Sequence, residues 1–209
     1  MSATVQGNSG AFTVTGGLTF ADGSLVDLGN QMSLVGDQTL GGDGEIRFRS
    51  GAEIRNFNQT TFGPGLTIHR ADAGNTSIFM VGGSITNQAT IRADAAGQIR
   101  VTSNNPGIAA FTNAVGGVLA AAGGTLFIDT TTTNNGTAQA LGGGSLNLRS
   151  TIIGGTISSS GTGKLLLNAG TLQGVTLAGV AEVQTDSFAK GGLTLNGGQL
   201  IVNATRKLT

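Results

Sequence analysis

The sequence predicts an all-β fold in which short strands repeat along the chain and stack into a solenoid with a repeat of about 20 residues per turn. Three observations support this fold class. Apolar and polar residues alternate in short segments, similar segments recur at a nearly constant spacing, and glycine makes up 37 of the 209 residues. Alternation with period two indicates strands, a fixed period of this length indicates a repeat architecture, and glycine permits the sharp bends between strands.

The amino-terminal part of the chain shows the alternation in AFTVTGGLTF, SLVDLG and GEIRFRSG. In GEIRFRSG, Ile46 and Phe48 precede Leu66 and Ile68 of GLTIHR by one such period. This spacing predicts that the two pairs of apolar side chains face a common core, one turn above the other.

Three consecutive segments in the middle of the chain share one pattern: ITNQATIRADAAGQIRV, FTNAVGGVLAAAGGTLFID and TTNNGTAQALGGGSLNLR. Each contains Thr-Asn near its start, an alanine, a turn of small residues and a strand with alternate apolar residues. A helix is disfavoured because the alternation has period two and glycine recurs within the segments. The equivalent positions are asparagines at corners (Asn87, Asn113 and Asn134), inward alanines (Ala93, Ala120 and Ala140) and a core stack (Ile99, Leu126 and Leu146).

The repeat also predicts the dimensions of the molecule. Asparagine tolerates left-handed backbone at a bend and can form ladders of stacked side-chain amides. With about 4.8 Å between turns, the chain would make about ten turns, a rod roughly 50 Å long. The step from Ile99 to Leu126 is longer than the usual period, which predicts a longer loop in that turn. The carboxyl-terminal third continues the pattern less regularly and no linker interrupts it, so residues 1–209 are expected to form one domain, a segment of a longer chain.

The segment from Asn113 to Ile128 and its two neighbours follow the pattern Thr-Asn-x-small-x-x-x-Ala-small-Gly-Gly-x-Leu-x-Ile. This pattern resembles the repeats of large bacterial secreted β-helix proteins, in particular filamentous-haemagglutinin-like adhesins and autotransporter passenger domains. The resemblance covers the three central segments well and the rest of the chain loosely. It implies a single-stranded, right-handed parallel β-helix displayed at the bacterial cell surface or outside the cell, with a role in adhesion or as a stalk.

Composition narrows the range of functions. Eleven acidic and eleven basic residues give a formal net charge of zero, without the basic excess typical of nucleic-acid binding. The chain has no cysteine, which excludes disulfides, thiolate metal sites and a cysteine nucleophile. It has no tryptophan or tyrosine, which disfavours aromatic-lined ligand pockets. No apolar run is long enough to span a membrane, and the amino terminus lacks the features of a signal peptide.

The densest group of charged residues offers the best candidate for a polar site: Glu45, Arg47, Arg49 and His69. In the register set by the repeat, Thr67 stacks over Arg47 and His69 over Arg49 on the outer face. We interpret this group as a solvated face with ion pairs, because glycoside hydrolysis needs two paired carboxylates and catalytic zinc sites usually need more than one histidine. Binding of an anionic ligand and catalysis on a polysaccharide are the alternatives.

Two further residues are singled out on the outer face of the repeat. Phe127 points outward in a chain that has few aromatic residues, so it is a candidate contact for a partner or lies beneath the long loop of its own turn. Asp129 is expected to lie beneath Arg149 and to form an ion pair with it across the turns.

The sequence therefore predicts a structural and adhesive extracellular solenoid, an adhesin stalk or surface fibre, without catalysis, metal or cofactor. The expected partners are host or matrix glycans and proteins, or further copies of the chain; nucleic acid is not expected, nor is membrane insertion. Two alternatives remain open. The first is a filament subunit that stacks end to end, and the second is a β-helix protein that binds or degrades polysaccharides.

Overall fold

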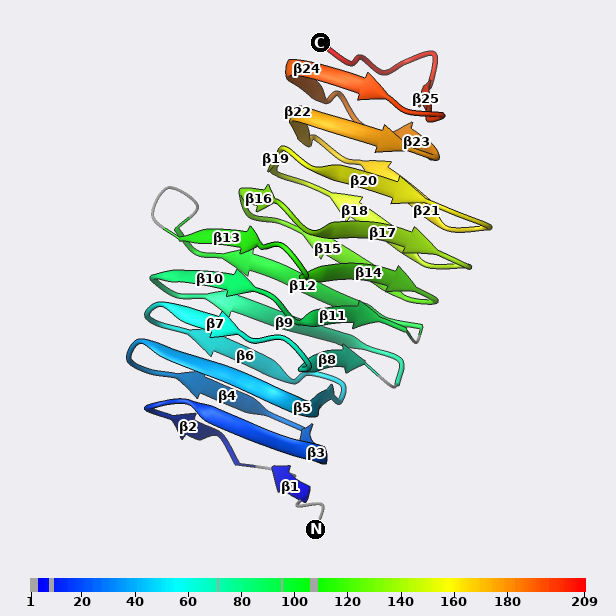
Figure 1. The fold of residues 1–209 in the computed structure, drawn as a ribbon. Helices are drawn as coiled ribbons and strands as arrows, with labels where there is room; N and C mark the ends of the chain where they lie inside the picture. Colours follow the sequence, from blue (N-terminus) through cyan, green and yellow to red (C-terminus); the bar gives the residue numbers. More distant parts are fainter. Residues whose placement is uncertain (1–3, 8–9, 71, 95, 106–108) are drawn as a thin grey trace.

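A computed structural model describes residues 4–7, 10–70, 72–94, 96–105 and 109–209. It confirms the predicted fold class. Every regular element in the described residues is a β-strand, the strands pair in parallel, and they stack into a solenoid of about nine turns (Figure 1). Among the described residues, no helix has the length and apolar character needed to cross a membrane.

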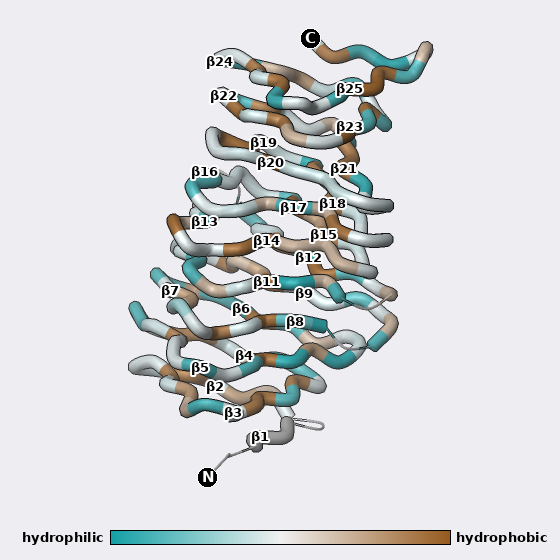
Figure 2. The backbone as a smooth tube through the Cα atoms, turned by 45° about the vertical axis from the view of Figure 1, so that its right-hand side comes forward, coloured by the Kyte–Doolittle hydropathy of each residue, from teal (hydrophilic) through white to brown (hydrophobic). Residues whose placement is uncertain are grey.

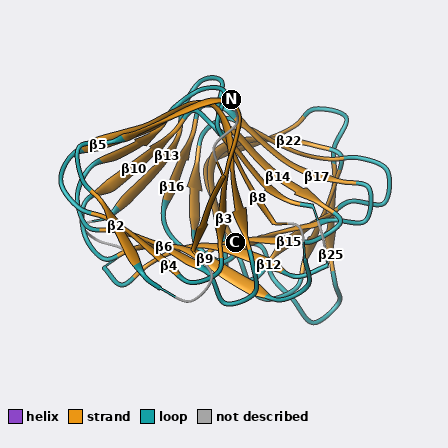
Figure 3. Cartoon of the chain, turned by 90° about the horizontal axis from the view of Figure 1, so that it is seen from below, coloured by secondary structure: helices purple, strands orange, loops and turns teal. Residues whose placement is uncertain are grey.

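Each turn has three sides, which we call the first, second and third side in chain order. The first and second sides form one 15-stranded sheet, and the third side forms a 10-stranded sheet. The first two sides join because four strands bend and run along both of them. Figure 3 shows the sides from one end of the solenoid.

The strands of each side share their position within the turn. The first side contains β7 (Thr60–Phe62), β10 (Ser84–Asn87), β13 (Ala110–Asn113), β16 (Thr132–Asn134) and β19 (Thr151–Ile153). The second side contains β1 (Thr4–Gly7), β8 (Thr67–Arg70), β11 (Thr90–Ala93), β14 (Val118–Ala122), β17 (Thr137–Leu141) and β20 (Thr156–Ser159). The strands shared by both sides are β3 (Leu18–Leu28), β5 (Gln38–Phe48), β22 (Thr171–Ala178) and β24 (Phe188–Leu195).

The third side contains ten strands, which follow one another in chain order. Its members are β2 (Phe12–Val14), β4 (Gln31–Leu34), β6 (Glu53–Asn56), β9 (Asn75–Met80), β12 (Gln98–Ser103), β15 (Thr125–Ile128), β18 (Ser145–Leu148), β21 (Lys164–Leu167), β23 (Val180–Val183) and β25 (Gln199–Val202).

Alternate side chains of these strands fill a narrow core. The expected stack is present: Ile99 pairs with Leu126 and Leu126 with Leu146, and all three are fully buried. The tube in Figure 2 shows apolar and polar positions alternating along the turns. Because burial of apolar surface is the main favourable term in folding, these columns hold the turns together.

The three central asparagines form a ladder inside the corner between the first and second sides. Asn87 Nδ2 donates to Asn113 Oδ1 at 2.9 Å, and Asn113 Nδ2 donates to Asn134 Oδ1 at 2.8 Å. The same nitrogens also donate to backbone carbonyls, for example from Asn113 to Thr137 O at 3.0 Å. All three side chains are fully buried, so the ladder provides partners for polar groups that water cannot reach. The exception is Asn87 Oδ1, which has no hydrogen-bond partner among the described residues.

Glycines beside the ladder allow the backbone to pass close to it. A Cβ atom on Gly117 would lie 2.3 Å from Asn87 O and 2.6 Å from Asn113 Oδ1. On Gly136 it would lie 2.3 Å from Gly117 O. No other residue fits these two positions without displacement of the backbone, which explains why glycine follows asparagine at this corner.

The prediction that Ala120 points inward is wrong. Ala121 pairs with Ala93 and Ala140, whereas Ala120 pairs with Arg92 and Gln139 of the outer face. Ala120, Ala121 and Ala122 are all small and apolar, so the sequence does not show which of them point inward. The inward alanine is therefore one residue away from the predicted one. The longer loop predicted between Ile99 and Leu126 falls between β12 and β13. Residues 106–108 within it are outside the described residues.

Substitution of Asn113 by alanine should lower the free energy of unfolding by about 2 to 4 kcal/mol, because it leaves buried acceptors on Asn134 and Thr137 without donors. Chemical denaturation measures this change. The matched control is Asn135→Ala, which removes an exposed amide and should cost less than about 0.5 kcal/mol. Equal losses in the two variants would show that the ladder does not stabilise the fold.

Candidate functional site

The charged residues singled out from the sequence lie on the outer face of the second side, around β5 and β8. The register differs from the expected one, because Glu45 pairs with Thr67 and Arg47 pairs with His69. The predicted stack of His69 over Arg49 is therefore wrong. Ile46 pairs with Ile68 instead of Leu66, so this turn is longer than the sequence spacing suggested.

Arg70 shows why the sequence spacing was misleading. It pairs with Phe48 and Ala93 and points into the core, where it is fully buried. Its Nε donates to Asp72 O at 2.6 Å and its Nη2 to Asp72 Oδ1 at 2.8 Å. Burial lowers the pKa of Arg70 below its usual value, against the opposing effect of Asp72. A charged residue at an inward position does not register in a search for apolar alternation.

Asp27 pairs with two arginines of the next turn, Arg47 on β5 and Arg49 directly after β5. Its carboxylate accepts hydrogen bonds from Arg47 Nε at 3.3 Å and Nη2 at 2.9 Å, and from Arg49 Nε at 3.0 Å and Nη2. The carboxylate is almost fully buried, with 1% of the side chain exposed. The hydrogen bonds from Arg49 and Arg47 lower the pKa of Asp27 to about 2, and the same bonds raise the pKa of both arginines.

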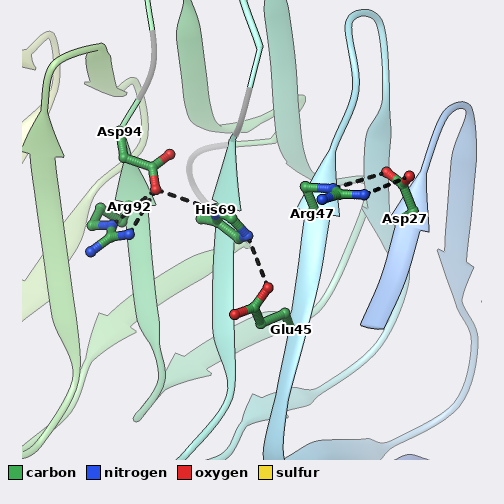
Figure 4. Close-up of polar contacts among 6 residues, drawn as sticks. All are labelled: Asp27, Glu45, Arg47, His69, Arg92 and Asp94. Carbon is green, nitrogen blue, oxygen red and sulfur yellow. Dashed lines mark hydrogen bonds and ion pairs between the residues drawn. The ribbon is translucent and has the colours of Figure 1, made fainter. Parts of the chain in front are cut away.

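His69 lies between two carboxylates that come from the turns on either side of it (Figure 4). Its Nδ1 is 3.1 Å from Asp94 Oδ2, and its Nε2 is 3.4 Å from Glu45 Oε2. Arg92 completes the chain by donating to Asp94 Oδ2 at 3.1 Å through Nε and at 2.8 Å through Nη2. Together with the pair of Asp27 and Arg47, these polar contacts join four successive turns.

The chemistry of this arrangement is that of cross-turn ion pairing. A histidine held by a carboxylate can act as a general base when its other nitrogen faces a reacting group. Here Nε2 faces the carboxylate of Glu45. Next to Glu45 lies a shallow depression of about 420 Å³ that also contains Asp22 and Asp43. In the described part of the chain, no three acidic or histidine side chains are arranged to hold a metal ion.

The remaining residues expected to matter also have defined places. Asn87, Asn113 and Asn134 form the corner ladder, and Ile99, Leu126 and Leu146 form the core stack described above. Phe127 points outward, but only 7% of the residue is exposed. Two arginines lie over it: the guanidinium carbons of Arg100 and Arg149 are 5.4 Å and 4.2 Å from the centre of its ring.

The expected pair between Asp129 and Arg149 is replaced by another. Asp129 accepts from both Nε and Nη2 of Arg100, the Nε bond being 2.8 Å long. Arg149 stacks on Phe127 instead. Sequence reasoning also missed Asp27, Arg92 and Asp94, because their roles depend on the register between turns. The separation of Asp27 and Arg47 by one repeat was the signal available for the first of them.

The ion pairs of Asp27 predict a specific loss of stability in acid. Because its pKa is lower in the folded chain than the ordinary value of 3.8, its contribution is complete above about pH 5 and is lost as the pH falls towards 2. The difference in unfolding free energy between the parent protein and Asp27→Asn should shrink by about 2 kcal/mol over this range.

Urea denaturation at several pH values between 2 and 6 measures this difference. Asp22→Asn changes an exposed aspartate in the same way and serves as the control for the loss of one carboxylate. A difference between the parent and Asp27→Asn that stays constant with pH would contradict the assigned role of Asp27.

Comparison with known proteins yields no similarity to report: no family model, curated protein or solved structure matches this chain.

Proposed function

We propose that this chain is a structural and adhesive segment of an extracellular bacterial protein, a stalk or surface fibre that carries its contacts on the outer faces of a solenoid. The observation that supports the proposal most is the unbroken column of inward side chains on the third side. Its members are Met32, Ile54, Ile78, Val101, Ile128, Leu148, Leu167 and Val183.

Such a column suits a rod because each turn contacts only its neighbours. In repeat proteins of this kind, stability is roughly the sum of the turns and of the interfaces between them. The outer side chains of successive turns are then held about 4.8 Å apart along the axis. A surface with such regular spacing is suited to contact with extended partners. The resemblance of the repeats to secreted β-helix adhesins points to the same role.

Surface labelling of the source bacterium tests this proposal. An antibody raised against residues 10–209 should stain intact cells, or label material shed into the medium, as strongly as it stains permeabilised cells. Staining that requires permeabilisation would contradict an extracellular role. A strain that lacks the gene controls for cross-reaction of the antibody.

A second candidate function is self-association at the end of the solenoid. In the last turn, Phe188, Leu195 and Val202 are exposed by 45%, 51% and 42%. Residues 203–209 cross only the start of β24, where Ala189 N donates to Thr209 O and Thr209 N donates to Ser187 O. Apolar side chains and strand edges at one end can pair with another chain.

Sizing over a hundredfold range of concentration tests the second candidate. An association through this end should increase the apparent mass with concentration, and Leu195→Lys should shift the association to higher concentration. The exposed Val115, which lies away from the end of the solenoid, gives the matched control Val115→Lys. A protein that stays monomeric at all concentrations would exclude this function.

A further inference from the structure

Five consecutive turns each place one arginine or phenylalanine on the outer face of the third side, in two neighbouring columns of the register. The series consists of Arg55 on β6, Phe79 on β9, Arg100 on β12, Phe127 on β15 and Arg149, which directly follows β18. We call these five residues the arginine strip. Register places Arg55 directly below Phe79, and Arg100 directly below Phe127. Thr102 lies directly above Phe79, so Arg100 and Phe127 stand in the column beside that of Arg55 and Phe79.

The aromatic rings hold the guanidinium groups against the sheet. The guanidinium carbon of Arg55 lies 6.0 Å from the centre of the Phe79 ring, and those of Arg100 and Arg149 lie on the Phe127 ring from opposite neighbouring turns. The Arg55 and Arg100 side chains are still 43% and 42% exposed, and Arg149 is exposed. Each guanidinium is therefore held in place and remains open to solvent.

The charges of the strip are only partly balanced within the protein. Arg55 pairs with Glu53, and Arg100 pairs with Asp129. Among the ion pairs between described residues, none includes Arg149. Three arginines thus face two carboxylates. An arginine fixed by stacking loses little freedom on binding, and its planar fork matches a carboxylate through two parallel hydrogen bonds.

A shallow depression of about 340 Å³ lies between Arg55 and Arg100 at the lower part of the strip. Amide and hydroxyl side chains line it beside the arginines. They include Gln31, Asn75 and Ser77, and the carboxylate of Glu53, which is paired with Arg55, lies beside them. Amides and hydroxyls can donate hydrogen bonds to sugar hydroxyls and accept bonds from them, so the depression adds neutral polar contacts to the cationic ones.

We propose that the arginine strip binds an acidic polysaccharide, with uronate carboxylates on the arginines and sugar hydroxyls in the depression. This inference rests on the proposed adhesive function and names a ligand class and a site for it. Arginines in alternate turns are about 10 Å apart along the axis, twice the spacing between strands. A polyuronate presents carboxylates at regular intervals along an extended chain, which fits arginines that stand in alternate turns and in two neighbouring columns.

An acidic peptide fits the strip less well. Its carboxylates lie on mobile side chains whose ordering costs free energy on binding. The ring of Phe127 is also covered by arginines, so that an apolar peptide side chain finds no open surface there.

Binding of polygalacturonate oligomers to the full chain, measured by calorimetry at low and at physiological salt, tests the proposal. Arg149→Gln should weaken binding about tenfold, and Arg149→Lys should restore only part of the affinity because it keeps the charge without the planar fork. The matched control is Arg206→Gln, which removes an exposed arginine outside the strip and should leave the affinity unchanged.

A neutral glucan and polyglutamate of similar length complete the design. The proposal is supported if the parent protein prefers the polyuronate to both and if the preference is lost in Arg149→Gln. It is overturned if no polyuronate binding is detected, if polyglutamate binds as tightly, or if Arg149→Gln and Arg206→Gln weaken binding equally. Circular dichroism of each variant separates a lost site from a lost fold. Failure of this experiment leaves the result of surface labelling unaffected, so the two proposals fail separately.

Discussion

Parallel hydrogen bonding between successive turns fixes the position of every other feature of this molecule. Once two turns pair, each inward side chain lies on its counterpart, as Ile99, Leu126 and Leu146 do, and each outward side chain has a defined neighbour above and below. Residues a whole turn apart in the chain therefore become direct contacts. The corner ladder, the ion pairs around His69 and the arginine strip all depend on this register.

Polar groups inside the solenoid are accommodated because the register provides partners for them. Burial of an amide or a charge costs free energy unless the group is hydrogen-bonded or paired. The corner asparagines satisfy one another, Arg70 is paired with Asp72, and Asp27 is enclosed by two arginines. The asparagine ladder and the pairs of Asp27 require one particular alignment of turns, whereas Arg70 and Asp72 pair within one turn. A slip between turns would therefore break several buried pairs at once.

The sequence was sufficient to predict the solenoid, its central repeats and the corner asparagines, because these follow from local alternation and from residues that repeat at fixed spacing. It was insufficient for the candidate site. The turn from Ile46 to Ile68 is longer than the predicted period, which places His69 beside Arg47. Additional residues in a bend do not change the alternation within the strands, so the alternation could not reveal them. Arg70 and Ala121 were missed because a buried arginine and a run of alanines both break the apolar pattern on which the prediction relied. Asp129 has two candidate partners, Arg100 and Arg149, and spacing alone does not decide that it pairs with Arg100.

The alternation of arginine and phenylalanine has a period of two turns, whereas the core and the corners repeat with every turn. Gain or loss of a single turn within the strip, by duplication or deletion of one repeat, would preserve the core but would put arginine next to arginine or ring next to ring. Gain or loss of two turns would preserve both patterns only where each ring stays in the column of its arginine. The contacts between arginine and ring therefore constrain the number of turns in this part of the solenoid more tightly than the core does, because each contact spans two turns whereas the core repeats in one.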